Sequence, residues 1–143
     1  MNWAYLRDDV PEISCVKSLV AGRDIRCVLD LHEDWESPGY YLYEQFNKVS
    51  IGQMLIERVR SVCPIDGRTR IDGEDAADGV IFPNMNAPKL RDGSGIPISL
   101  FREGHTERMI TAESPSSLDF DVRVLGHLAA IDGALDHLAS NSG

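Results

Sequence analysis

An apolar segment that ends in charged side chains occurs between Val28 and Asp34. In a strand, side chains two residues apart share a face, so Asp30 and His32 lie together and Glu33 points to the opposite face. A carboxylate in this position commonly orients a metal-binding histidine. The spacing predicts that Asp30 orients the His32 ring and makes His32 a candidate metal ligand, and a capped or solvated histidine is the structural alternative.

A second apolar segment, residues 108–115, ends in Glu113, Ser114 and Pro115. Open α/β sheets bind ligands at the carboxyl ends of their strands, which places Glu113 where a general base is needed. A surface glutamate or a helix-capping partner is the alternative. The presence of both residue types at the ends of strands in one chain favours a shared site for Asp30, His32 and Glu113.

Together, Asp-Leu-His at 30–32 with the residues up to Glu44, and Thr-Ala-Glu-Ser-Pro at 111–115, resemble the zinc carboxypeptidase family. The similarity is to its small bacterial cytosolic branch, in a clan that includes succinylglutamate desuccinylase and aspartoacylase, and it runs through the whole chain. The resemblance implies that His32 is a zinc ligand and that Glu113 is the base that activates zinc-bound water. It also implies a peptide or an N-acyl amino acid as substrate.

The sequence departs from this family at three places. It contains no His-x-x-Glu, the family's first zinc motif, and no tyrosine after Tyr43. The Asp-x-Asn-Arg motif that binds the substrate carboxylate falls at the start of the chain, where Asn2 is a candidate but the arginine is missing. We therefore expect residues 1–143 to be a single domain, the C-terminal portion of a carboxypeptidase-like catalytic domain, that binds no zinc on its own. A diverged homologue is the other explanation.

Three functions are compatible with these motifs. The leading hypothesis is a zinc-dependent hydrolase that removes a C-terminal amino acid from a peptide, here incomplete and inactive. Deacylation of an N-acyl amino acid is the alternative chemistry in the same fold, and a non-catalytic domain that binds a peptide or a partner subunit is the alternative class. His-Glu-Asp-Trp-Glu at 32–36 is no zincin motif, because that motif needs a helix. His105, His127 and His137 have weaker claims, and the tyrosines at 40–43 are expected mainly to pack.

Periodicity and capping signals predict the elements that position these residues. Helices are expected after capping boxes at Asp9 and Ser50, and from Asp119 to about Ala139. The last helix is expected to face a sheet with an apolar stripe formed by Val122, Leu125, Leu128, Ile131, Leu135 and Leu138. Strands are expected at 25–31, 40–43, 96–101 and 109–112, and residues 64–96 are expected to be mostly irregular, with a strand at 80–82. The class is α/β, with three α/β/α layers and a mainly parallel or mixed sheet.

Composition restricts the partners and the compartment. The 143 residues carry a net charge of −9, which argues against nucleic-acid binding, and no apolar run approaches the length of a membrane helix. The three cysteines lack metal-site spacing and are expected to be buried, reduced thiols. With no signal peptide visible, we expect a cytoplasmic protein, and uncovered apolar surface on an incomplete domain is expected to favour a homo-oligomer.

Overall fold

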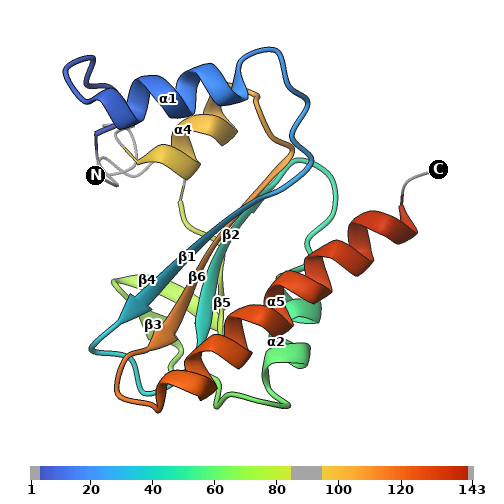
Figure 1. Cartoon of the computed structure of the whole chain (residues 1–143). Helices are drawn as coiled ribbons and strands as arrows, with labels where there is room; N and C mark the ends of the chain where they lie inside the picture. Colours follow the sequence, from blue (N-terminus) through green and yellow to red (C-terminus); the bar gives the residue numbers. More distant parts are fainter. Residues whose placement is uncertain (1–3, 85–94, 142–143) are drawn as a thin grey trace.

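A computed structural model describes residues 4–84 and 95–141 of the chain. Its central element is one six-stranded sheet (Figure 1). The strands are β1 (Val28–Asp34), β2 (Tyr41–Phe46), β3 (Arg70–Ile71), β4 (Glu74–Ala77), β5 (Val80–Ile81) and β6 (Arg108–Pro115). The helices are α1 (Pro11–Val20), α2 (Gly52–Val59), α4 (Ile96–Arg102) and α5 (Phe120–Ser140).

The strand order is β1-β6-β2-β5-β4-β3. β1 is parallel to β6 and β2 is parallel to β5, whereas β2 and β6 are antiparallel, so the sheet is mixed. The expected α/β class is confirmed. Because β6 inserts between β1 and β2, the two segments singled out for their chemistry become hydrogen-bonded neighbours, although about 80 residues separate them in sequence.

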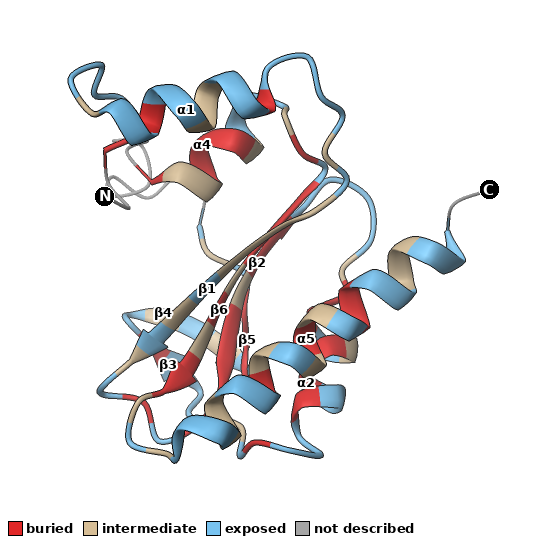
Figure 2. Ribbon diagram, viewed as in Figure 1, coloured by how far each residue is buried: buried red, intermediate tan, exposed pale blue. Residues whose placement is uncertain are grey.

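Helices α2 and α5 cover one face of the sheet and bury most of the core, as the red segments of Figure 2 show. The buried residues of α5 are Gly126, Ala130, Gly133 and Ala134. These small residues allow α5 to approach α2 closely, since a Cβ at Gly133 would lie 2.7 Å from the Leu55 side chain of α2. The predicted apolar stripe is therefore wrong at Leu125, Leu128 and Leu135, which are 48%, 47% and 57% exposed, whereas Val122 of the same stripe packs against the core.

Helices α1 and α4 pack on each other and cover the opposite face where β1 and β6 begin. The strand predicted at 96–101 is wrong, because these residues form α4. Pro97 lies in its first turn, a position that tolerates proline because the missing N–H has no partner there in any case. Helices on both faces complete the three-layer arrangement.

Residues 70–81 form two hairpins where mostly irregular chain was expected. Asp72-Gly73 and Asp78-Gly79 have positive φ throughout, at 52° and 82° in the first pair and 48° and 81° in the second. Two-residue turns of this kind require such angles, and Asp-Gly is a preferred sequence for them. These pairs hold β3 against β4 and β4 against β5, and β5 confirms most of the strand predicted at 80–82.

Both predicted capping boxes are wrong. The N-cap residues are Val10 for α1 and Ile51 for α2, and neither makes a side-chain capping hydrogen bond. For α2 the buried carboxylate of Glu44 takes this role, since it accepts hydrogen bonds from the backbone N–H groups of Ile51 and Gly52 at 2.8 and 2.9 Å. A cap supplied by a neighbouring strand leaves no local signal in the sequence.

Two further expectations concern the cysteines and the membrane. The three cysteines are free, as expected, but Cys15 is exposed on α1 instead of buried. Within residues 4–84 and 95–141, no helix combines the length and the apolar character needed to cross a bilayer.

Candidate active site

The central row of the site crosses three strands. His32 of β1 is in register with Glu113 of β6, and Glu113 is in register with Tyr41 of β2 on its other side. Alternate residues of a strand share a face, so all three side chains lie on the face opposite α2 and α5. Glu33, the next residue along β1, forms an ion pair with Arg123 of α5 on the helix-covered face, as the alternation requires.

The next row on the same face contains Asp30, Thr111 and Tyr43, again in mutual register. Asp30 Oδ2 lies 2.7 Å from His32 Nε2. The sequence-predicted residues Asp30, His32 and Glu113 are thus brought together at one end of the sheet. The fourth, Asn2, lies outside the described residues.

The contact with Asp30 fixes the orientation of the His32 ring. The Asp30 carboxylate accepts a hydrogen bond from Nε2–H, and in the neutral ring this leaves the lone pair on Nδ1, the nitrogen with which such a histidine would bind a metal. This tautomer is assigned from the hydrogen bond, since no hydrogen position is observed. The geometry matches the role of an orienting carboxylate that the sequence predicts for Asp30.

The backbone of His32 is held from behind by His127 of α5. His127 Nε2 lies 3.1 Å from the His32 carbonyl oxygen, and Tyr40 Oη lies 3.1 Å from His127 Nδ1. Burial lowers the pKa of His127 and so favours the neutral ring. This ring donates a hydrogen bond from Nε2–H to the His32 carbonyl oxygen and accepts one at Nδ1 from the Tyr40 hydroxyl group. Sequence analysis gave His127 only a weak claim, because nothing local indicates that α5 crosses behind β1.

The carboxyl group of Glu113 is surrounded by other carboxylates. Its pKa is raised to about 7: partial burial is the largest cause, repulsion from Asp34, Asp30 and Asp72 adds to it, and the attraction of His32 opposes them. A carboxyl with a pKa near neutrality exchanges protons readily at physiological pH, which is the property that general acid–base catalysis requires.

A cavity of about 350 Å³ extends from this row along the sheet towards α4. It is lined by Asp30, His32, Tyr43, Gln45, Asp72, Glu74, Pro83, Gly95, Pro97, Ile98, Met109, Thr111 and Glu113. Asp72 and Glu74 come from the β3–β4 hairpin, and Asp72 accepts a hydrogen bond from Tyr43 Oη at 2.8 Å. Neither of these two acidic residues was predicted from the sequence as part of the site. The signal that could have found them is the Asp72-Gly73 pair, which is typical of a hairpin turn.

The described residues do not provide a complete zinc site. A catalytic zinc takes three protein ligands and a water molecule. Among residues 4–84 and 95–141, no group of three or more His, Cys, Asp or Glu side chains is arranged to hold a metal. The site offers one oriented imidazole, His32, and one candidate base, Glu113, and so does not fit zinc by itself.

The chain matches no protein-family model and no curated protein. It is similar to three crystal structures, each of a “putative metallopeptidase”. These are from Shewanella amazonensis SB2B (20% identity, TM-score 0.70), Shewanella baltica OS155 (27%, 0.67) and Shewanella denitrificans OS217 (21%, 0.71). The matches cover 88%, 86% and 89% of this chain but 45%, 44% and 47% of those proteins. The chain therefore has a metallopeptidase-like fold and spans less than half the length of the proteins it matches.

Proposed function

We propose that residues 1–143 are the C-terminal part of the catalytic domain of a metallopeptidase-type hydrolase, which removes a C-terminal amino acid from peptides. The observation that carries the proposal is the register of His32 with Glu113 on a face that borders a cavity. Resemblance to the zinc carboxypeptidases at residues 30–44 and 111–115 adds support, as does the metallopeptidase-like fold.

In this proposal Glu113 takes a proton from the attacking water and returns it to the leaving amine. A pKa of about 7 suits both steps, because the group is close to half-ionised at neutral pH. Asp30 orients the His32 ring, and His127 fixes the backbone that carries it. His32 would supply one ligand to a zinc ion, whose remaining ligands would have to come from polypeptide outside this chain.

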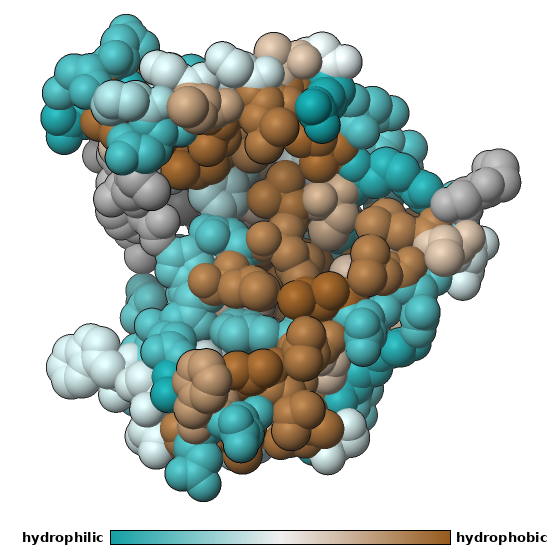
Figure 3. Space-filling model, in the orientation of Figure 1, coloured by the Kyte–Doolittle hydropathy of each residue, from teal (hydrophilic) through white to brown (hydrophobic). Residues whose placement is uncertain are grey.

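An uncovered apolar surface supports the view that more polypeptide packs here. β1 is the last strand on its side of the sheet, and its Leu31 is 43% exposed. Leu125, Leu128 and Leu135 of α5 are also about half exposed, and Figure 3 shows patches of apolar surface on this view of the molecule. An edge strand beside exposed leucines is an expected place for further strands and helices to pack.

The competing function is a non-catalytic domain that binds a peptide in the same cavity. It is favoured by the lack of a three-ligand metal group within the described ranges. The two proposals differ in whether Glu113 has a proton-transfer role.

The test uses the gene from which the chain is taken. Any in-frame upstream segment that carries His-x-x-Glu is expressed together with residues 1–143, and release of free amino acid from dipeptides is measured. Glu113→Gln is expected to reduce turnover about 10²- to 10⁴-fold with zinc content unchanged. Glu33→Gln, on the opposite face of the adjacent strand, is the control and is expected to retain activity. Activity that survives Glu113→Gln would refute the catalytic role.

A further inference from the structure

The side chain of Gln45 is buried at the α4 end of the cavity without a hydrogen-bond partner. The residue is 5% exposed, and neither Oε1 nor Nε2 makes a hydrogen bond. Leaving a buried amide unpaired is costly, and most such groups in folded proteins are satisfied. Because Gln45 lines the cavity, the missing partner is best explained as a ligand that enters there.

The charge of the cavity wall indicates what kind of ligand this is. Asp30, Asp72, Glu74 and Glu113 contribute carboxyl groups, whereas no lysine or arginine lines the cavity within the described part of the chain. A concave wall of one charge sign concentrates ligands of the opposite sign. The Gln45 carbonyl oxygen adds an uncharged acceptor for an N–H donor.

The lining of the cavity extends along β6, which gives room for an extended side chain. Gln45 is in register with Met109, which precedes Glu113 by four residues on β6, so the two rows lie about 13 Å apart. Between them, Met109, Ile98 and Pro97 offer apolar contact, and Tyr43 holds the Asp72 carboxylate in place. An aliphatic stem that ends in a cationic group matches this sequence of surfaces.

We propose that the cavity binds the basic side chain, of the lysine or arginine type, of the C-terminal residue of a peptide, with its cationic group between Asp72, Glu74 and Gln45. The identity of the peptide rests on the proposed function, whereas binding of the basic side chain does not require hydrolysis. When the ligand is present, the Gln45 Oε1 atom accepts a hydrogen bond from its cationic group.

The experiment is a calorimetric titration of the 143-residue chain with Ala-Arg, Ala-Lys, Ala-Leu and Ala-Glu, and with agmatine, which has a guanidinium group but no peptide bond. Ala-Arg and Ala-Lys are expected to bind at least 10-fold more tightly than Ala-Leu, with Ala-Glu weakest. Agmatine binding without any dipeptide hydrolysis in the co-expressed protein would support the cation site and count against the proposed function.

Variants distinguish recognition from a structural role. Gln45→Leu is expected to weaken Ala-Arg binding about 10- to 100-fold, as for loss of a hydrogen bond to a charged group, and to raise Tm because an unpaired amide is removed.

Asp72→Asn is expected to weaken the binding of Ala-Arg but not the binding of Ala-Leu, and it keeps the test available if Gln45→Leu does not fold. Asp75→Asn, whose side chain alternates to the other face of β4, is the control. Equal affinity for Ala-Leu and Ala-Arg, or no binding of any basic probe, would overturn the proposal.

Discussion

The protonation of Glu113 makes the stability of the isolated chain dependent on pH. Its pKa is about 7 in the folded chain against an ordinary value of 4.5. Below pH 4.5 both the folded and the unfolded chain hold the proton, so Glu113 contributes nothing to the pH dependence. Between pH 4.5 and 7 the unfolded chain releases the proton first, and the free energy of unfolding falls as pH rises. Above pH 7 Glu113 is ionised in both states, and the free energy of unfolding stays lower by the full amount that corresponds to the pKa shift.

The size of this effect follows from the two pKa values. Shifting one ionisation from 4.5 to about 7 corresponds to about 3 kcal/mol. Because the Glu113 side chain is only partly buried, solvent screens part of the repulsion, and we expect about 1–2 kcal/mol. Glu113→Gln keeps the size of the side chain and removes the ionisation, so it should recover this amount at pH 8 and nothing at pH 4.

Thermal unfolding followed by circular dichroism, at intervals from pH 4 to pH 8, measures the effect. The Tm of Glu113→Gln is expected to exceed that of the unsubstituted chain by roughly 3–8 °C at pH 8, and to equal it at pH 4. Glu12→Gln, an exposed residue in the first turn of α1, is the control and should give no pH-dependent difference. A Tm difference that is constant with pH would show that folding does not shift the pKa of Glu113, and a Tm that is higher for the unsubstituted chain at pH 8 would show that the carboxyl group is stabilised as an anion. Either result would refute this reasoning.

Three other variants test the packing that supports the site. Glu44→Gln removes a buried charge that accepts hydrogen bonds at the start of α2, and urea unfolding should give a loss of about 2–4 kcal/mol. Gly133→Ala places a Cβ 2.7 Å from Leu55, so a loss of about 1–3 kcal/mol is expected although alanine favours helix, and a gain would contradict the close contact. Replacing both Leu128 and Leu135 by serine should change stability by less than about 1 kcal/mol, because both are about half exposed, and should reduce self-association in sedimentation experiments.

The parts of the site that the sequence predicted are those determined by local alternation. Asp30 and His32 share a face because they are two residues apart on a strand, and Glu113 lies in a second strand whose apolar residues identify it. Their meeting depends on β6 entering the sheet beside β1, which the fold class favours but no local pattern specifies.

The errors arose where tertiary contacts override local pattern. Leucines at helical spacing in α5 looked like a core face, but glycine and alanine on the other face allow closer packing against α2 and so are buried instead.

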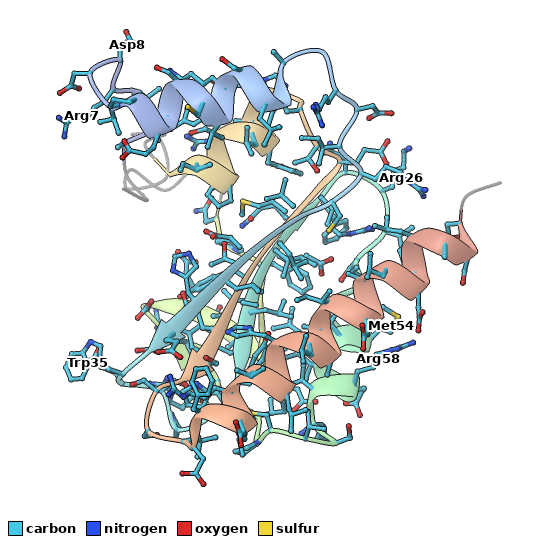
Figure 4. All side chains as sticks on the ribbon, viewed as in Figure 1. Arg7, Asp8, Arg26, Trp35, Met54 and Arg58 are labelled. Carbon is cyan, nitrogen blue, oxygen red and sulfur yellow. The ribbon has the colours of Figure 1, made fainter. Side chains whose placement is uncertain are left out.

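Residues 96–101 have β-branched and aromatic side chains, yet they form a helix that has Pro97 in its first turn. The strand expected at 25–31 is β1, which spans Val28–Asp34 at the edge of the sheet, and Figure 4 shows the Trp35 side chain pointing outward just beyond its end. Gln45 carries no signal in sequence, because only the cavity makes its amide unusual.

The central claim is that this chain carries one imidazole and the base of a hydrolytic site but not a complete zinc centre. Metal analysis of the purified 143-residue chain after gel filtration tests it most directly, with His32→Ala as the matched control. The account predicts well under one zinc per chain, no difference between the chain and His32→Ala, and no release of amino acid from dipeptides. One tightly held zinc per chain that is lost in His32→Ala would contradict it, since this chain would then complete the site itself.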